Sequence, residues 1–355
     1  MTEPLVSVVV VTWNGAHLLA GCLDALERQT LDRDLYEVVV VDNASVDGTP
    51  ELVAERWPRA VLLRNDANLG FAGGCNTALR WTRAPFAMLV NNDAELAPDV
   101  LERMLAAMRA DDGVAALTAK VLLQARFVPG DGPDAVTLPD GRRLRPLPDG
   151  EDAPDAVDLL NSTGNFVRTD GFAQDRGWLT VDGEQDFGAD VFGFCGAAAL
   201  LRMDAVRALG FFDERWFLYY EDVDLSWRLR LAGWRNGYVP EAVVRHAHSQ
   251  TTGEGSALHR FHDDRNRLLT WAKCAPADLA LRWTLKHLVV VLLLLRNEWP
   301  SLRMTRVRLR ALVSYARLLP HALRERRRLT RAAALTRRQV ARQLVEPTAS
   351  ASYRT

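Results

Sequence analysis

Three groups of side chains in this 355-residue sequence have the types and spacing needed for chemistry on a charged substrate. The first is Asn91-Asn92-Asp93, with a second acid at Glu95, directly after the apolar run at residues 86–90. A carboxylate flanked by amide oxygens suits a hard divalent cation that carries phosphates. Ordinary Asx turns use the same residue types, so this motif alone leaves both interpretations open.

The second group is Glu221-Asp222-x-Asp224, at the start of a helix that the sequence predicts over residues 221–233. A carboxylate acts as a general base when it reaches the proton that it removes. Acids in a first turn also complement the helix dipole, and spacing alone does not separate the two roles. The aromatic run at residues 216–220 is typical both of sugar-binding surfaces and of packed cores.

The third group is His246 and His248, which face the same side of an extended chain because they are two residues apart. Either imidazole is able to join a carboxylate in a metal shell. Asp42, at the end of another predicted strand, is placed to bind a ribose or to cap a turn. The glycine loop at residues 70–76 lets a backbone approach a ligand closely. It matches neither the GxGxxG fingerprint nor a P-loop, which disfavours a dinucleotide oxidoreductase and an ATPase.

These groups need a scaffold, and four short apolar runs predict one. The runs occupy residues 5–12, 37–41, 61–64 and 86–90, and a polar loop and a helical pattern follow each of them. This alternation predicts an α/β fold in which helices flank a mostly parallel, Rossmann-like sheet. Right-handed crossovers then bring all four loops to one edge of the sheet. Residues 124–190 are rich in Pro, Gly and Asp, which predicts a helix-free surface excursion.

The net charge of −1 conceals a strong asymmetry along the chain. Residues 301–355 carry 14 Arg against two Glu, so residues 1–300 carry a net charge of −13. A basic helical tail with apolar faces predicts docking on an anionic membrane surface. A solvated helical bundle, or a contact between copies of the chain, is the alternative for the tail. The acidic body disfavours nucleic acid as a partner.

Cysteine usage and apolar runs indicate the compartment. The four cysteines are scattered without a CxxC pair, which disfavours a zinc or disulfide framework and indicates reduced thiols. The N-terminus has no basic region of the kind that precedes a signal sequence. No stretch reaches the roughly 20 apolar residues of a spanning helix. We therefore expect a cytoplasmic protein that is peripheral at the inner face of the plasma membrane.

Several segments together resemble the family 2 glycosyltransferases of GT-A fold, most of all the rhamnosyltransferase-type members. They are residues 8–15, 38–49, 66–79, 89–96 and 193–234, and the resemblance extends over about residues 5–275. It implies inverting transfer of a sugar, L-rhamnose from dTDP-rhamnose, to a hydroxyl of a glycan or lipid-linked acceptor in polysaccharide or cell-wall synthesis. UDP-sugars carrying galactofuranose, glucose or N-acetylglucosamine are the alternative donors.

Two other classes of protein remain as alternatives. A nucleotidyltransferase of similar architecture would have a glycine-rich loop with Arg and Lys after the first strand, and Trp13-Asn14-Gly15 lacks it. Asp93 and Asp222 argue against an inactive carbohydrate-binding relative.

The resemblance also assigns roles to individual residues. It implies that Asp222 is the catalytic base and that Asp93, with His246 or else His248, holds Mn²⁺ or Mg²⁺. Asn91 stands where the family has an acid, which leaves one negative charge fewer at the metal. On the acceptor side the implied residues are Cys195, Gly196, Trp216 and Glu221. The implied walls of the nucleotide-sugar pocket are Thr12, Asn14, Asp42, Asn43, Asn68, Gly70, Asn76, Asn91 and Asn92.

The expected organisation has three parts. Residues 1–275 form the glycosyltransferase domain, with a nucleotide-sugar-binding half at 1–120 and an acceptor-binding half at 121–275. Residues 276–345 form a basic helical extension, and residues 346–355 form a disordered tail.

Overall fold

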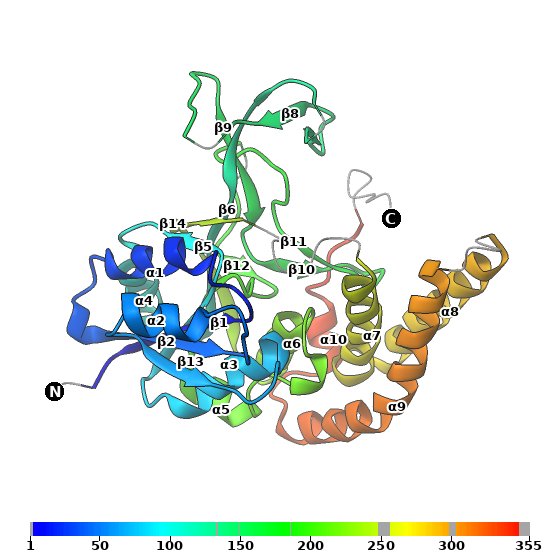
Figure 1. Cartoon of the computed structure of the whole chain (residues 1–355). Coiled ribbons are helices and arrows are strands. Elements are labelled where there is room, and N and C mark those ends of the chain that lie inside the picture. Colours follow the sequence, from blue (N-terminus) through cyan, green and yellow to red (C-terminus); the bar gives the residue numbers. More distant parts are fainter. Residues whose placement is uncertain are drawn as a thin grey trace.

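The computed structural model describes residues 3–132, 134–148, 150–184, 186–247, 256–297 and 303–347. Its main sheet has the strand order β12-β14-β6-β13-β4-β1-β2-β3 (Figure 1). Four neighbouring strands of this sheet run parallel. They are β1 (Val6–Thr12), β2 (Tyr36–Asp42), β3 (Val61–Arg64) and β4 (Phe86–Asn91). The predicted α/β fold with a mostly parallel sheet is therefore confirmed.

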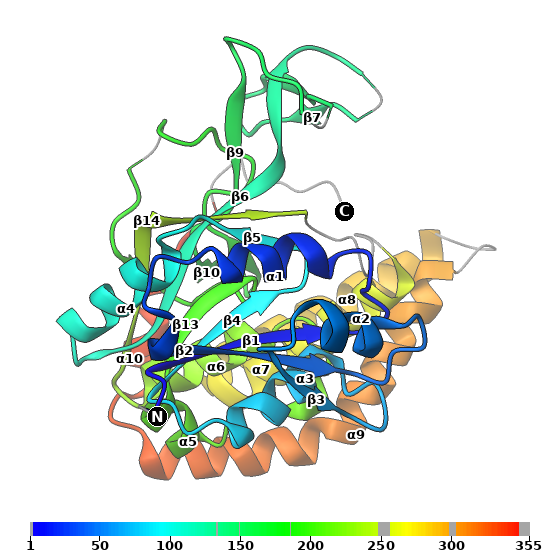
Figure 2. The ribbon, with the colours of Figure 1, turned by 60° about the vertical axis from the view of Figure 1, so that its left-hand side comes forward.

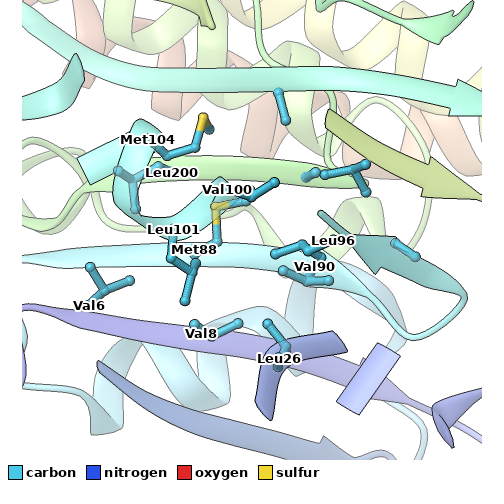
Figure 3. Close-up of a cluster of buried hydrophobic side chains, with 14 of the residues drawn as sticks. Val6, Val8, Leu26, Met88, Val90, Leu96, Val100, Leu101, Met104 and Leu200 are labelled. Atoms are coloured by element: carbon cyan, nitrogen blue, oxygen red, sulfur yellow. The ribbon is translucent and has the colours of Figure 1, made fainter. Parts of the chain in front are cut away.

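Helices cover both faces of this sheet. Alternate valines of β1 point to opposite sides, so that Val8 joins one apolar cluster and Val9 the other. Figure 3 shows Val8 and Met88 beneath Leu101 in the first cluster. That face carries α1 (Leu19–Glu27), α2 (Thr49–Arg56) and α4 (Val100–Ala110). The other face carries α3 (Gly70–Trp81), α5 (Met203–Leu209) and α6 (Glu221–Leu231). Burial on both faces explains why the strands are continuous apolar runs.

The second half of the sheet brings a distant strand to the same edge. β13 (Ala198–Arg202) runs antiparallel to both β4 and β6 (Val114–Pro129), and β6 runs parallel to β14 (Arg235–His246). Consequently β14 ends at the edge where β4 ends. The short strand β5 (Ala94–Leu96) pairs with β14 and sets Ala94 opposite His246.

Residues 124–190 contain no helix among those that the structure describes, as predicted. The far end of β6 projects from the body as an arm (Figures 1 and 2). The arm's other strands are β7 (Val136–Thr137), β8 (Arg143–Pro146) and β9 (Val157–Ser162). The chain then returns as a hairpin of β10 (Asn165–Val167) and β11 (Ala173–Asp175), before β12 (Asp190–Val191).

The basic extension is helical, as predicted, and its longest helix packs on the domain that precedes it. The C-terminal helices are α7 (Ala257–Cys274), α8 (Ala277–Asn297), α9 (Arg303–Ala332) and α10 (Arg337–Ala341). Ala322 of α9 shares an apolar cluster with Leu269 of α7 and with Trp216. Nε2 of His321 lies 2.7 Å from Oδ2 of Asp213. α7 and α9 lie side by side in Figure 1.

Two further predictions concern the C-terminal tail and membrane-spanning helices. The disorder predicted for residues 346–355 concerns a segment that lies, from 348 onward, outside the described residues. No helix within the described ranges is both long enough and apolar enough to cross a bilayer.

Candidate active site

The carboxyl ends of the parallel strands bring the predicted nucleotide residues together. In the sheet register Thr12 lies opposite Asp42, and Val11 lies opposite Asn91. Asp42 is fully buried, and its carboxylate accepts hydrogen bonds of 3.3 Å from the backbone N–H of Ser45. Polar groups from separate loops therefore meet at one edge, as right-handed crossovers require.

Side-chain amides tie these loops to one another. Asn43 donates from Nδ2 to the carbonyl oxygen of Gly70 at 3.0 Å. Asn92 donates to Oγ1 of Thr12 at 3.2 Å. Asn14 has a φ of +50° and accepts from the backbone N–H of Val46 at 2.9 Å. This network holds the ends of the loops in one arrangement.

The glycine loop begins at Gly70, a position where only glycine fits. Gly70 has a φ of +69°, and a Cβ there would lie 2.3 Å from the carbonyl oxygen of Phe217. Asn68 supports the same turn by accepting from the N–H of Gly70 at 2.9 Å. Asn76, on the helix that follows, has no exposed surface and donates to the carbonyl oxygen of Phe212 at 2.9 Å. In this conformation Asn76 positions the chain and offers no atom to a nucleotide.

A histidine and an aspartate from distant segments meet at the same edge. Nε2 of His246 lies 3.1 Å from Oδ1 of Asp93 and 3.2 Å from Nδ2 of Asn91. Nδ1 of His246 lies 2.7 Å from Oδ1 of Asn161. An amide oxygen only accepts, so the Nδ1 atom carries a proton and donates it to Asn161. In the neutral imidazole, Nε2 is then the nitrogen that accepts or binds a cation.

This pair has the donor chemistry of a divalent metal site. Adjacent ligands of an octahedral Mg²⁺ with bonds of about 2.1 Å are roughly 3 Å apart, which matches the 3.1 Å between Asp93 and His246. Among the described residues no group of three or more His, Cys, Asp or Glu side chains converges on a metal position. Two protein ligands suit an ion that also takes oxygens from a diphosphate. The alternative ligand, His248, lies outside the described residues.

Asp222 is held by two backbone hydrogen bonds and has a raised pKa. Its Oδ2 accepts from the N–H of Gly196 at 3.3 Å, and Nδ2 of Asn165 lies 3.5 Å away. Its Oδ1 accepts from the N–H of Val223 at 2.7 Å. Burial, reinforced by the charge of Asp175, raises the pKa of Asp222 to about 7, against the opposing effect of the backbone hydrogen bonds. A general base works best with a pKa near the operating pH.

The other acids of this helix have different surroundings. Asp224 is fully buried, and its carboxylate lies 2.8 Å from Nε of Arg228 and 3.0 Å from Nζ of Lys273. Burial raises the pKa of Glu221 well above its usual range, and the negative charge of Asp222 adds to the effect. Oε2 of Glu221 is buried without a hydrogen-bond partner. The three acids therefore differ in their surroundings: Asp224 is ion-paired in the core, Glu221 has a buried oxygen without a partner, and Asp222 accepts backbone hydrogen bonds.

The aromatic loop before α6 has a strained backbone, and a residue of α7 holds it in place. Phe217, Tyr219 and Tyr220 all have φ values between 63° and 67°, a costly conformation for bulky residues. Asn266 on α7 holds the loop by donating to the carbonyl oxygens of residues 216, 218 and 219 at 2.7–2.9 Å. Trp216, expected to contact the acceptor, has no exposed surface and donates from Nε1 to Thr270 at 3.0 Å. It packs the loop against α7 instead.

The residues that lead into β13 connect the Asn91-Asn92-Asp93 segment to Asp222. The N–H of Asn91 donates to the carbonyl oxygen of Ala197 at 3.0 Å, and the preceding residue, Gly196, donates to Asp222. Cys195 stands beside them, and burial raises the pKa of its thiol well above the usual range, so the thiol stays protonated. The edge that holds Asp93 thus continues directly to Asp222.

Sequence reasoning missed four residues that position this site, namely Asn161, Asn165, Asp175 and Asn266. The first three come from the segment that was expected only as a surface excursion. Asn161 follows the apolar pair Leu159-Leu160, a weak strand-end signal of the kind that marked Asp42 and Asp93. Nothing in the sequence singles out the other three, because their partners lie far away along the chain.

Comparison with known proteins identifies the family. The domain model of glycosyl transferase family 2 matches residues 7–126, and that of glycosyl transferase family group 2 matches residues 163–335. The chain belongs to glycosyltransferase family 2, and within it the chain is rhamnosyltransferase-like. It is 32% identical over 299 residues to the N-acetylglucosaminyl-diphospho-decaprenol L-rhamnosyltransferase of Mycobacterium tuberculosis. That match covers 81% of this chain and 90% of the relative.

Solved structures support the GT-A fold. A mannosyltransferase from Pyrobaculum calidifontis, in complex with GDP-Man and Mn²⁺, superposes with a TM-score of 0.51 at 21% identity. The superposition covers 93% of this chain and 86% of that one. GalNAc-T7 with UDP, GalNAc and Mn²⁺ gives a TM-score of 0.55 at 15% identity, over 76% of this chain and 48% of that one. At these identities the likeness concerns the fold alone.

Proposed function

We propose that this glycosyltransferase moves L-rhamnose from dTDP-rhamnose, with inversion, to a hydroxyl of a lipid-linked glycan acceptor in cell-wall synthesis. The observation that carries the proposal is the position of Asp222, a partly buried carboxylate with a raised pKa, next to the edge that holds Asp93 and His246. The name of the mycobacterial relative supports the choice of rhamnose and of a lipid diphosphate acceptor.

The nucleotide would lie along the carboxyl ends of β1, β2 and β4, near the buried carboxylate of Asp42. The residues that we assign to this half are Thr12, Asn14, Asp42, Asn43, Asn68, Gly70, Asn91 and Asn92. Asp93 and His246 would hold Mn²⁺ or Mg²⁺, which as a Lewis acid neutralises charge that develops on the diphosphate. Asn161 keeps His246 in the tautomer that such binding requires.

Asp222 would accept the proton of the acceptor hydroxyl. The acceptor hydroxyl oxygen forms a bond to the anomeric carbon while the bond from that carbon to the diphosphate breaks. The hydroxyl proton passes to the carboxylate of Asp222, and the nucleoside diphosphate leaves on the opposite face of the sugar. One carboxylate then suffices, whereas a glycosidase uses two. Gly196 keeps Asp222 in place, and Cys195 and Glu221 would line the acceptor side of the site.

A panel of nucleotide sugars tests the proposal. Calorimetric titration with dTDP-rhamnose, UDP-galactofuranose, UDP-glucose and UDP-N-acetylglucosamine, each with and without Mn²⁺, ranks the donors, and donor hydrolysis then follows. We expect dTDP-rhamnose to bind most tightly and only with metal present. Tighter binding of a UDP-sugar would replace the donor assignment, and binding of none of the four would overturn the proposal.

A further inference from the structure

A cavity lies between the C-terminal helices and the β10–β11 hairpin, away from the nucleotide edge. Its volume is about 230 Å³, many times the roughly 10–15 Å³ that one water needs. Four cationic side chains line it, Arg260, Arg267, Lys286 and Arg308, against two acids, Asp170 and Asp264.

Both acids of the cavity already have cationic partners. Asp264 lies 2.6 Å from Nη2 of Arg267, and Asp170 pairs with Arg168, which is not part of the lining. Within the described ranges no carboxylate lies at ion-pair distance from Arg260 or Lys286. The cavity therefore has positive charge in excess.

Three residues of the lining also have buried donors without partners. Nε of Arg260 and Nε of Arg267 make no hydrogen bond. Nδ1 of His287 lies 3.4 Å from Nη2 of Arg267 and must accept there, because a guanidinium only donates. The proton of the neutral ring is then on Nε2, which is buried and unpartnered. Burial lowers the pKa of His287 to about 4, so the ring is neutral at pH 7. A buried donor without a partner is costly, so an anion that reached these groups would be favoured there. Oδ2 of Asp264 also lacks a hydrogen bond, and it lies 3.6 Å from Nε of Arg308.

The cavity is connected to the catalytic carboxylate by the β10–β11 hairpin. Asn165, at one end, lies 3.5 Å from Asp222, while the turn at the other end supplies Asp170 and Phe172 to the cavity wall. Trp271 fixes that turn by donating to the carbonyl oxygen of Gly171 at 2.8 Å. Five residues of extended chain span at most about 17 Å, so the two ends of the hairpin are no further apart than this.

An apolar surface adjoins the cavity. Val290 lines it from α8 and is 39% exposed. On the same helix Leu285, Val289, Leu292 and Leu293 are each more than half exposed. A ligand that fits both features has an anionic head group and a long apolar tail.

We infer that this cavity binds the diphosphate of a polyprenyl-diphosphate acceptor, with the prenyl chain over α8 and the sugar directed to Asp222. The inference rests on the proposed function only for the identity of the head group. Arg260, Lys286 and the Nε2 proton of His287 donate to the phosphate oxygens, and the aromatic wall of Phe172 and Trp271 faces the first isoprene units.

Titration with farnesyl diphosphate, farnesol and inorganic pyrophosphate tests the inference, using the full chain and calorimetry. We expect farnesyl diphosphate to bind more tightly than the other two, and Arg260→Gln or Lys286→Gln to weaken it about tenfold. Arg282→Gln removes an exposed charge from the same helix outside the cavity, and it should leave binding unchanged. Equal binding of pyrophosphate and farnesyl diphosphate would assign the cavity to free anions and overturn the lipid assignment.

Kinetics with a synthetic prenyl-diphosphate sugar acceptor give the second readout. The Arg260 and Lys286 variants should raise the KM for this acceptor about tenfold with kcat nearly unchanged, because the reacting groups stay in place. An unchanged acceptor KM would overturn the inference. Absence of dTDP-rhamnose binding in the wild-type protein would overturn the proposed function alone, because prenyl diphosphate binding does not depend on the donor.

Discussion

Nε2 of His246 lies 3.1 Å from Oδ1 of Asp93, although Asp93 is in the turn between β4 and β5 and His246 is the last residue of β14. Their proximity follows from the pairing of β5 with β14, which sets Ala94 opposite His246. Strand pairing therefore creates the only juxtaposition of a histidine and an aspartate at this edge among the described residues.

Asp93→Asn and His246→Gln should each abolish the metal dependence of donor binding. Either change removes one of two protein ligands, and the remaining one holds a divalent ion weakly. The measurement is calorimetric titration of donor with and without Mn²⁺. Glu95→Gln is the matched control, because Glu95 is an exposed acid only two residues away and should leave the metal effect intact. If Asp93→Asn kept the full metal effect, the assignment of Asp93 would be wrong.

Asp222→Asn should bind donor normally but lose transfer by about 10³-fold, the typical contribution of a general base. The same variant should be more stable at pH 8, by on the order of 1–3 kcal/mol, because it removes a carboxylate that ionises against burial. Urea denaturation and single-turnover transfer give the two readouts. Transfer at near wild-type rate would remove Asp222 from the role of base.

The rate of transfer should rise with pH through about 7. The pKa of Asp222 is raised to about 7, and only the ionised carboxylate accepts a proton, so activity is low below that pH and reaches a plateau above it. The free energy of unfolding should change in the opposite direction, because the folded state favours the protonated form of Asp222. It should fall as pH rises through 7. A rate profile that is flat between pH 5.5 and 8.5, at saturating metal, would contradict this assignment.

Asp224→Asn should destabilise the fold by about 3 kcal/mol, because it leaves Lys273 and Arg228 in the core with less compensating charge. Donor binding per folded molecule should remain. Denaturant unfolding followed by near-UV circular dichroism measures the loss. If the Asp224→Asn protein were stable but inactive, Asp224 rather than Asp222 would be the acid that does the chemistry.

Binding to anionic vesicles should depend on the exposed apolar face of α8. Leu292→Asn combined with Leu293→Asn should weaken flotation with phosphatidylglycerol vesicles at least about tenfold, since each leucine gains about 1.5–3 kcal/mol on full burial. Trp81→Gln, at an apolar residue of α3 that is 44% exposed, serves as control. Truncation before α8 is a poorer test, because it would also remove α9 and uncover Leu269 and Trp216. Equal flotation of all three proteins would exclude α8 as the contact.

The sequence by itself determined the parallel sheet and the polar edge at Asp42 and Asp93, because strand periodicity and the residues after each strand are local properties. It also predicted an acidic helix start at residues 221–224, and the family resemblance, rather than the spacing, indicated Asp222 as the acid that does chemistry. The tertiary structure adds the surroundings that separate the acids, since Lys273 and Arg228 pair with Asp224 while Gly196 and Asn165 contact Asp222. The roles of Asn76 and Trp216 were likewise decided by burial, which depends on distant elements. Strand pairing, helix docking and the unpartnered donors of the cavity beside the β10–β11 hairpin are long-range relations, and no spacing in the sequence expresses them.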